Sequence, residues 1–194
     1  MSSTGEVACF GQNVQEAFLQ SLLASNFQLP LKHNKILISI AEDKMRLEFL
    51  GSAEQLIEMG YSLVGTPGTA DFYSVRGITI GTLLKPDVTK ASEETADNEN
   101  IDDAAVTWIM EKKVDLLINV PEGSNKREEI SAGYLMRRAA VDFGCSLITN
   151  MKCAVMFADA LHRNKELPCK SADEYIGSSH VGYASHQKQS MNDD

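Results

Sequence analysis

The chain has 194 residues, 43% of them hydrophobic and 23% charged, which is the balance of a soluble globular domain able to bury a core without disulfides. No apolar run approaches the length of a membrane-spanning helix and no secretory signal is visible at the start, so no membrane partner is expected. The formal net charge of −9 disfavours binding to nucleic acid, and an anionic ligand needs a local cluster of cations.

The first 34 residues are predicted to form a leader to the main domain. Residues 5–10 predict an extended piece, and residues 13–25 predict an amphipathic helix that Asn13 can cap. A proline among polar residues makes 29–34 typical of a linker. The apolar stripe of the helix needs a surface to cover.

From residue 35 short apolar runs alternate with helix-like segments, which is typical of βα units and a parallel sheet. The expected strands are 35–41, 61–64, 78–84, 114–120 and 146–149, and the expected helices are 46–59, 70–75, 101–112, 131–143 and 153–163. Polar composition predicts exposed loops over 86–100 and 121–129 and a disordered tail from 177 to 194. The pattern predicts a doubly wound, Rossmann-like α/β domain over 35–176, with five parallel strands and helices on both faces.

The turn Thr66-Pro67-Gly68-Thr69 follows the second expected strand and opens a helix. Two hydroxyls, several free N–H groups and the positive end of a helix dipole are expected to converge there on an anion. The alternative is that both threonines are only turn and N-cap residues.

Other polar residues follow the remaining strands, where the loops of a parallel sheet meet. Together they predict a pocket for a phosphorylated small molecule, made by Lys44, Thr66, Gly68, Thr69, Lys85, Asn119 and Thr149. Each has a plainer alternative: Lys44 could be a solvated lysine, Lys85 could simply end a strand, and Asn119 could satisfy loop backbone. Arg137 and Arg138 are neighbours on one helix, so at most one faces a given ligand.

No catalytic or metal-binding constellation is visible in the sequence. The four cysteines and four histidines show no ligand spacing, which indicates reduced thiols in a cytoplasm-like compartment and no structural metal. Asp102 and Asp103 could supply a general base, but aspartates at a helix start also serve a purely electrostatic role. Lys126 and Arg127 are expected to be solvated.

Five segments carry a resemblance to a known family: residues 3–11, 60–73, 117–121, 134–142 and 147–150. They resemble the methylglyoxal-synthase-like (MGS-like) domain at the carboxyl end of the large chain of carbamoyl phosphate synthetase, over about residues 3–163. The first segment is similar to the junction with the preceding synthetase domain. The resemblance therefore implies a piece of a larger enzyme, divided into a junction over 1–34, an effector domain over 35–176 and a tail.

The resemblance implies an allosteric module without chemistry or cofactor of its own, in a parent ligase that uses ATP and Mg. Its implied partners are the other synthetase domains, the glutaminase domain or subunit, and an effector such as UTP, UMP, IMP or phosphoribosyl pyrophosphate, with self-association left open. N-acetylglutamate is the alternative effector. Lys44, Thr66, Thr69, Lys85 and Asn119 match effector-pocket positions of the family, and an aromatic residue stands at position 85 in the N-acetylglutamate type.

Two positions differ from the pattern of the family. In addition, an enzyme activity is the alternative to a regulatory role. Pro121 and Gly133 stand where relatives offer polar side chains. The competing activity is that of methylglyoxal synthase, a lyase acting on dihydroxyacetone phosphate, whose catalytic aspartate falls near Asp102. Against it, Ala41 stands where that enzyme has a histidine, and its Gly-Gly-Asp turn reads Asn-Ile-Asp over 100–102.

Overall fold

A computed structural model describes the chain over residues 5–33, 35–86, 105–121, 131–164, 170–171 and 173–175. At its centre lies a five-stranded sheet of order β3-β2-β1-β4-β5, and all four pairings are parallel. The strands are β1 (Lys35–Ile40), β2 (Ser62–Gly65), β3 (Gly81–Thr82), β4 (Val114–Val120) and β5 (Ser146–Ile148). The chain runs outward from β1 to β3 and then returns to the other side of β1, so the strand order reverses between β1 and β4. In such sheets, ligands bind at the carboxyl ends of the strands beside this reversal.

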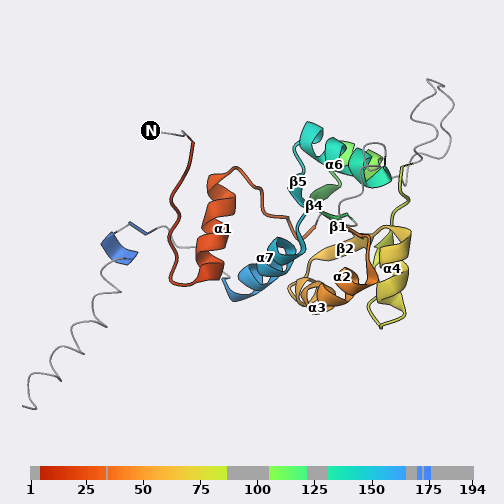
Figure 1. Ribbon diagram of the computed structural model, residues 1–194, viewed down its shortest axis with the longest axis horizontal. Helices are drawn as coiled ribbons and strands as arrows, with labels where there is room; N and C mark the ends of the chain where they lie inside the picture. The colour runs from red at the N-terminus through yellow and green to blue at the C-terminus, as the bar shows by residue number, and fades with distance from the viewer. Residues whose placement is uncertain are drawn as a thin grey trace, which may run out of the picture.

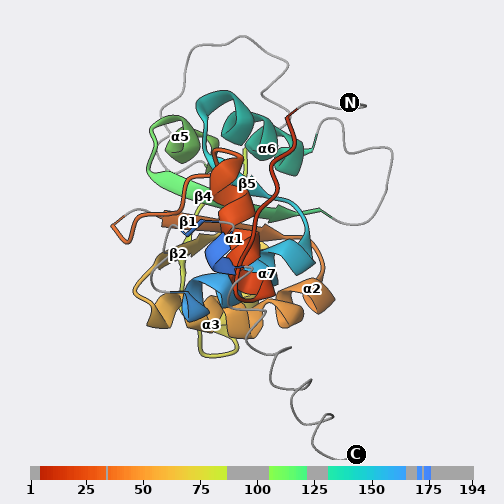
Figure 2. The same cartoon turned by 90° about the vertical axis from the view of Figure 1, so that its left-hand side faces the viewer.

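Helices cover both faces of the sheet, which confirms the predicted fold class (Figure 1). Seen along the sheet in Figure 2, α5 (Ala105–Met110) and α6 (Ala132–Phe143) lie on one face, and α3 (Leu50–Glu58) and α7 (Met151–Arg163) lie on the other. The remaining helices are α1 (Val14–Ala24), which packs on α7, α2 (Asp43–Glu48) and α4 (Pro67–Ser74). None of the described helices is long and apolar enough to span a bilayer.

The central strand is buried from both sides, which explains why four of its six residues are apolar. Ile36, Ile38 and Ile40 pack in the cluster that contains α3 and α7, whereas Leu37 packs with α5 and α6. All four are at most 2% exposed. Alternate side chains of a strand point to opposite faces, so a strand covered twice is expected to be apolar at nearly every position, and Ser39 is the buried exception in β1.

Local capping fixes several helix ends, and the cap at Asn13 and the stop at Gly144 are the two that the sequence predicts. Asn13, Ser131 and Asn150 each accept a hydrogen bond from the backbone N–H three residues later, as N-caps do. Gly144 follows α6 in the left-handed region at φ 71°, a conformation that glycine adopts without a Cβ clash. These signals depend on neighbouring residues only, which is why they are readable before the fold is known.

Several predicted elements differ from the structure, among them the last helix, which begins at Met151 rather than residue 153. The expected helix 46–59 begins at Asp43 and is divided at Phe49, whose fully buried ring joins α2 to α3. Helix α4 begins at Pro67 rather than residue 70, because proline's fixed φ suits a first helical position. The expected strand 78–84 shrinks to the two residues of β3 at the sheet edge, where Gly81 offers no side chain to pack. Residues 87–104, 122–130 and 176–194 lie outside the described part, and with them the predicted loops, the tail, Asp102, Asp103, Lys126 and Arg127.

The leader is tied to the main body by packing and hydrogen bonds. Leu19 of α1 is fully buried in the same cluster as α3 and α7, and Gln15 Nε2 donates to Asp159 Oδ2 at 2.9 Å. In the expected linker, the Leu31 N–H donates to Asp115 Oδ2 at 2.8 Å. The division of the chain at residue 34 remains a prediction.

Gly11 is expected to be intolerant of a side chain. A Cβ there would lie 2.3 Å from the backbone nitrogen of Ala17, so Gly11→Ala must displace the start of α1 and should destabilise the fold by about 2 kcal/mol. Gly51→Ala is the matched control, because no atom lies within 4 Å of its Cβ position and alanine favours a helix by up to about 1 kcal/mol. Urea denaturation of both variants measures the difference, and equal stabilities would contradict the close approach.

Candidate functional site

Buried polar side chains gather at one edge of the sheet. Six polar or charged side chains are buried in the described residues, and four of them lie at the carboxyl ends of β1, β2 and β4: Ser39, Thr66, Thr69 and Asn119. We call these four the polar row. Burial of a polar group is costly unless it is bonded, so such a cluster in an otherwise apolar core marks a place with a role other than packing.

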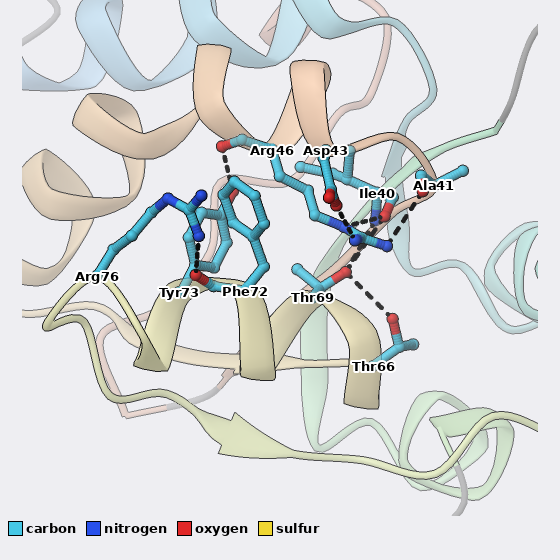
Figure 3. A network of polar contacts seen from close by, with 9 residues as sticks. All are labelled: Ile40, Ala41, Asp43, Arg46, Thr66, Thr69, Phe72, Tyr73 and Arg76. Atoms are coloured by element: carbon cyan, nitrogen blue, oxygen red, sulfur yellow. Dashed lines mark hydrogen bonds and ion pairs between the residues drawn. The ribbon is translucent and has the colours of Figure 1, made fainter.

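Thr66 and Thr69 direct their hydroxyl groups toward β1, as Figure 3 shows for Thr69. Thr66 Oγ1 donates to Ser39 Oγ at 3.3 Å and lies 3.3 Å from Thr69 Oγ1. Thr69 Oγ1 accepts from the Ile40 N–H at 3.2 Å. Thr66 occupies the N-cap position of α4, but its side chain makes no capping bond. These hydroxyls therefore hold the turn against the sheet rather than cap the helix.

The turn itself offers fewer free N–H groups than the sequence suggests. Pro67 has no N–H, and the N–H groups of Thr69 and Ala70 both donate to the Thr66 carbonyl, at 2.8 and 2.9 Å. Within this described turn, only the N–H of Gly68 is left without a backbone acceptor. The expectation of several free N–H groups is therefore wrong, and an anion bound here must draw most of its hydrogen bonds from side chains.

Asn119 of the polar row bonds to Arg137, which continues the row on the β4 side. Asn119 pairs with Ser39 across β1 and β4, and its Oδ1 accepts from Arg137 Nη1 at 2.6 Å. A Cβ at Gly133 would lie 3.2 Å from that Nη1, so the start of α6 passes close over both groups. Because Oδ1 accepts from a guanidinium, the amide nitrogen of Asn119 remains to act as a donor. Arg138 instead pairs with Asp142 on the surface at 2.7 Å, so only one of the two neighbouring arginines faces the site, as expected.

Arg46 joins the end of β1 to Asp43 of α2 (Figure 3). Its Nε donates to the Ile40 carbonyl at 2.8 Å, its Nη2 to the Ala41 carbonyl at 3.1 Å, and its Nη1 to Asp43 Oδ1 at 2.5 Å. Nη2 lies 3.4 Å from the place of a Cβ on Gly68, so the guanidinium lies beside the turn. Its side chain is 16% exposed. Arg46 is therefore a largely buried cation at the same edge.

The remaining predicted residues are exposed around this edge. Lys44 lies in the first turn of α2 directly after β1, Lys85 follows β3, and Thr149 follows β5. Neither lysine forms an ion pair with another described residue. Lys44 and Lys85 thus flank β2 from either side with uncompensated charge, whereas Thr149 lies beyond β4.

Three cavities are lined by residues of the described part, and none of the three is lined by a residue of the polar row. The largest of them, about 810 Å³, is lined by Lys32, Tyr61 and His162 among others, and these residues lie at the amino ends of the strands. The segments 87–104 and 122–130, which follow β3 and β4, are outside the described part. We therefore locate the candidate site by its chemistry and by the strand order, which agree with each other.

The described residues contain no cluster of three or more potential metal ligands. Burial raises the pKa of the Cys145 thiol to about 12, so this thiol is protonated at neutral pH and is not a ready nucleophile. What the site can do with the groups described is bind: it presents hydroxyl, amide and guanidinium donors and two exposed ammonium groups.

Sequence reasoning missed three members of this arrangement. Ser39 lies inside a largely apolar strand, Arg46 does not directly follow a strand, and the sequence does not distinguish Arg137 from Arg138. The separation of three residues between Asp43 and Arg46, which suits an ion pair on one helix face, was the available signal for Arg46.

Comparison with known proteins identifies the class. The family model of the MGS-like domain matches residues 48–149, and the chain belongs to this family. It is 42% identical over 177 residues to the multifunctional protein pyr1-3 of Dictyostelium discoideum, which covers 89% of the chain and 7% of that protein. It is 39% identical over 176 residues to the multifunctional protein URA2 of Saccharomyces cerevisiae, covering 89% of the chain and 8% of URA2.

A third relative is named for its enzyme activity. The chain is 36% identical over 175 residues to the mitochondrial carbamoyl-phosphate synthase [ammonia] of Aquarana catesbeiana, covering 90% of the chain and 11% of that protein. The chain thus spans about a tenth or less of the relatives it matches. The predicted resemblance to the MGS-like domain is confirmed.

Proposed function

We propose that the chain is the allosteric regulatory domain of a carbamoyl phosphate synthetase and binds a phosphorylated nucleotide or phosphoribosyl effector at the carboxyl edge of its sheet. Membership of the MGS-like family and the similarity to a carbamoyl-phosphate synthase support the regulatory part of the proposal. The effector candidates are UTP, UMP, IMP and phosphoribosyl pyrophosphate. The partners are the other synthetase domains and the glutaminase of the parent enzyme, where ATP and Mg are used.

The observation that carries the proposal is the polar row at the point where the strand order reverses. Four buried polar side chains there are continued by Arg46 at one end and by Arg137 at the other. Two more cations, Lys44 and Lys85, are exposed around the same edge of a chain whose formal net charge is −9. Concentrating cations against the overall charge of the molecule favours a multiply charged anion as the ligand.

Each part of the site has a proposed role. Lys44 and Lys85 neutralise the phosphate, Thr66 and Thr69 hold the turn on which Gly68 donates its N–H, and the Asn119 amide orients the ligand. Thr149 extends the site toward β5. A regulatory effect requires a difference in free energy between two states of the parent enzyme, typically about 1–3 kcal/mol.

The proposed contacts with phosphate are tested by Lys44→Ala and Lys85→Ala. Each is expected to lower affinity for UTP about tenfold, because each removes one charge-assisted contact with phosphate. Lys32→Ala is the matched control, since Lys32 is an exposed lysine at the opposite edge, beside the 810 Å³ cavity. Isothermal titration of the 194-residue chain measures the affinities. If both variants bind UTP unchanged and Lys32→Ala loses affinity, the ligand binds at the amino edge of the sheet and the proposed site is wrong.

The same titration distinguishes the effector classes. UTP, UMP, IMP, phosphoribosyl pyrophosphate and N-acetylglutamate should be compared on the wild-type chain. The lysine at position 85 favours a phosphorylated effector, and binding of N-acetylglutamate alone would contradict this part of the proposal.

The lyase reaction on dihydroxyacetone phosphate is the second candidate, and it shares the phosphate-binding edge. Ala41, whose carbonyl accepts from Arg46, has no side chain able to transfer a proton at the end of β1. We therefore expect no methylglyoxal when the chain is incubated with dihydroxyacetone phosphate. Turnover above background would count directly against a purely regulatory domain.

A further inference from the structure

Arg46 is held in one position from several sides. Its guanidinium is bonded to the two carbonyl groups at the end of β1 and to Asp43, and its own carbonyl accepts from the Tyr73 hydroxyl at 3.2 Å. The Phe72 ring lies beneath it, with its centroid 5.9 Å from the guanidinium carbon. A cation fixed in this way loses little side-chain entropy when it binds a ligand.

Part of this guanidinium is still available for hydrogen bonding. A guanidinium carries five N–H groups, and the bonds to Ile40, Ala41 and Asp43 use three of them. One N–H remains on each of Nη1 and Nη2, and Nη2 lies beside Gly68, whose N–H also has no backbone acceptor. Donors from two elements, α2 and the start of α4, therefore lie side by side.

Asp43 is the anion that now shares this guanidinium. Its carboxylate is 75% exposed and lies in the first turn of α2, so solvent competes for it, and the ion pair is easily rearranged. A phosphate oxygen at Gly68 would be attracted to the same cation and repelled by the Asp43 carboxylate. Asp43 would therefore weaken the binding of an anion at this place, whereas Arg46 would strengthen it.

We propose that Arg46 is a direct ligand of the effector phosphate, binding it together with the Gly68 N–H in competition with Asp43. This inference rests on the proposed function, since it concerns the same site. It adds a buried guanidinium to the two exposed lysines, and it makes the charge of Asp43 a determinant of affinity.

The first test replaces the cation. Arg46→Gln is expected to lower affinity for UTP and for inorganic phosphate by about tenfold to a hundredfold, and Arg46→Lys should recover only part of the loss because it cannot donate in a fork. Arg76→Gln is the matched control. Arg76 stacks on the same Phe72 ring at 3.6 Å and donates to the Phe72 carbonyl, but it lies after the carboxyl end of α4.

The second test leaves Arg46 in place and therefore does not depend on the folding of its variants. Asp43→Asn is expected to raise affinity for both probes about threefold to tenfold, because the competing carboxylate is lost. Glu48→Gln removes an equal charge from the exposed end of α2 and should have a smaller effect. In an Arg46→Gln background, Asp43→Asn should do no more than Glu48→Gln.

The outcomes separate this inference from the proposed function. If Lys44→Ala weakens binding but Arg46→Gln leaves it within about twofold, Arg46 is no ligand while the site stands. If Asp43→Asn raises affinity no more than Glu48→Gln does, the competition is refuted. If the wild-type chain binds neither UTP nor inorganic phosphate, both proposals fall.

Discussion

Replacing Asn119 by aspartate is expected to lower affinity for a phosphorylated effector by on the order of a hundredfold while the domain stays folded. Asn119 is 2% exposed, and its Oδ1 already accepts from Arg137 at 2.6 Å. A carboxylate at this position keeps that bond and pairs with the guanidinium. The free energy of unfolding is therefore expected to change little. The same negative charge replaces the amide donor by an acceptor and repels phosphate, and titration calorimetry with UTP measures the result.

Asn150→Asp is the control for this variant. Asn150 caps α7 at the same edge of the sheet, and aspartate caps a helix about as well as asparagine. It therefore adds the same charge to the same edge without altering the polar row, and a loss of only a few-fold is expected. Equal losses in the two variants would mean that Asn119 acts through charge alone and does not contact the effector.

Truncating Leu19 is expected to have the largest effect on stability. Leu19→Ala should lower the free energy of unfolding by about 2–5 kcal/mol, because the side chain is fully buried between α1 and the core that contains α7. Leu23→Ala lies on the same helix but is 39% exposed, and a much smaller loss is expected there. Thermal unfolding followed by circular dichroism measures both variants.

The shape of the unfolding curve of the Leu19 variant shows whether α1 unfolds together with the main domain. If α1 belongs to the cooperative unit, the Leu19 variant unfolds in one transition at lower temperature. If α1 is a separate leader, the main transition stays where it is in the wild-type chain. An unchanged main transition would contradict the packing of α1 and favour the predicted division at residue 34.

The parts of the fold that the sequence predicts are those determined locally or by burial on two faces. Strand β4 matches its prediction residue for residue, because an apolar run covered by helices on both sides has few alternatives. Helix α6, expected over 131–143, spans Ala132–Phe143 with Ser131 as its N-cap, and it ends before Gly144 as expected. The strand expected over 78–84 extends beyond β3 at both ends, and on the carboxyl side the reason is that β2 ends at Gly65, which pairs with Thr82.

The sequence predicts where the candidate site lies, but it does not predict which side chains contact one another there. Strand ends indicated Thr66 and Asn119, since loops of a parallel sheet meet at one edge. Ser39 gives no such signal, because a single serine in a buried strand is common, and only the register with Asn119 gives it a place in the polar row. The position of the Arg46 guanidinium depends on how the chain turns after β1. The spacing of apolar residues along the sequence does not specify that turn. The contact of Arg137 with Asn119 can be recognised only from the packing of α6 over β4.

The measurement that tests the central proposal most directly is an amide chemical-shift titration of the isotopically labelled chain with UTP. The account predicts saturable shifts that are largest for Thr66, Gly68 and Asn119, with little change at Lys32 and Tyr61. Shifts that saturate at Lys32, Tyr61 and His162 instead would place the ligand in the cavity at the opposite edge of the sheet. Such a result would contradict binding at the polar row.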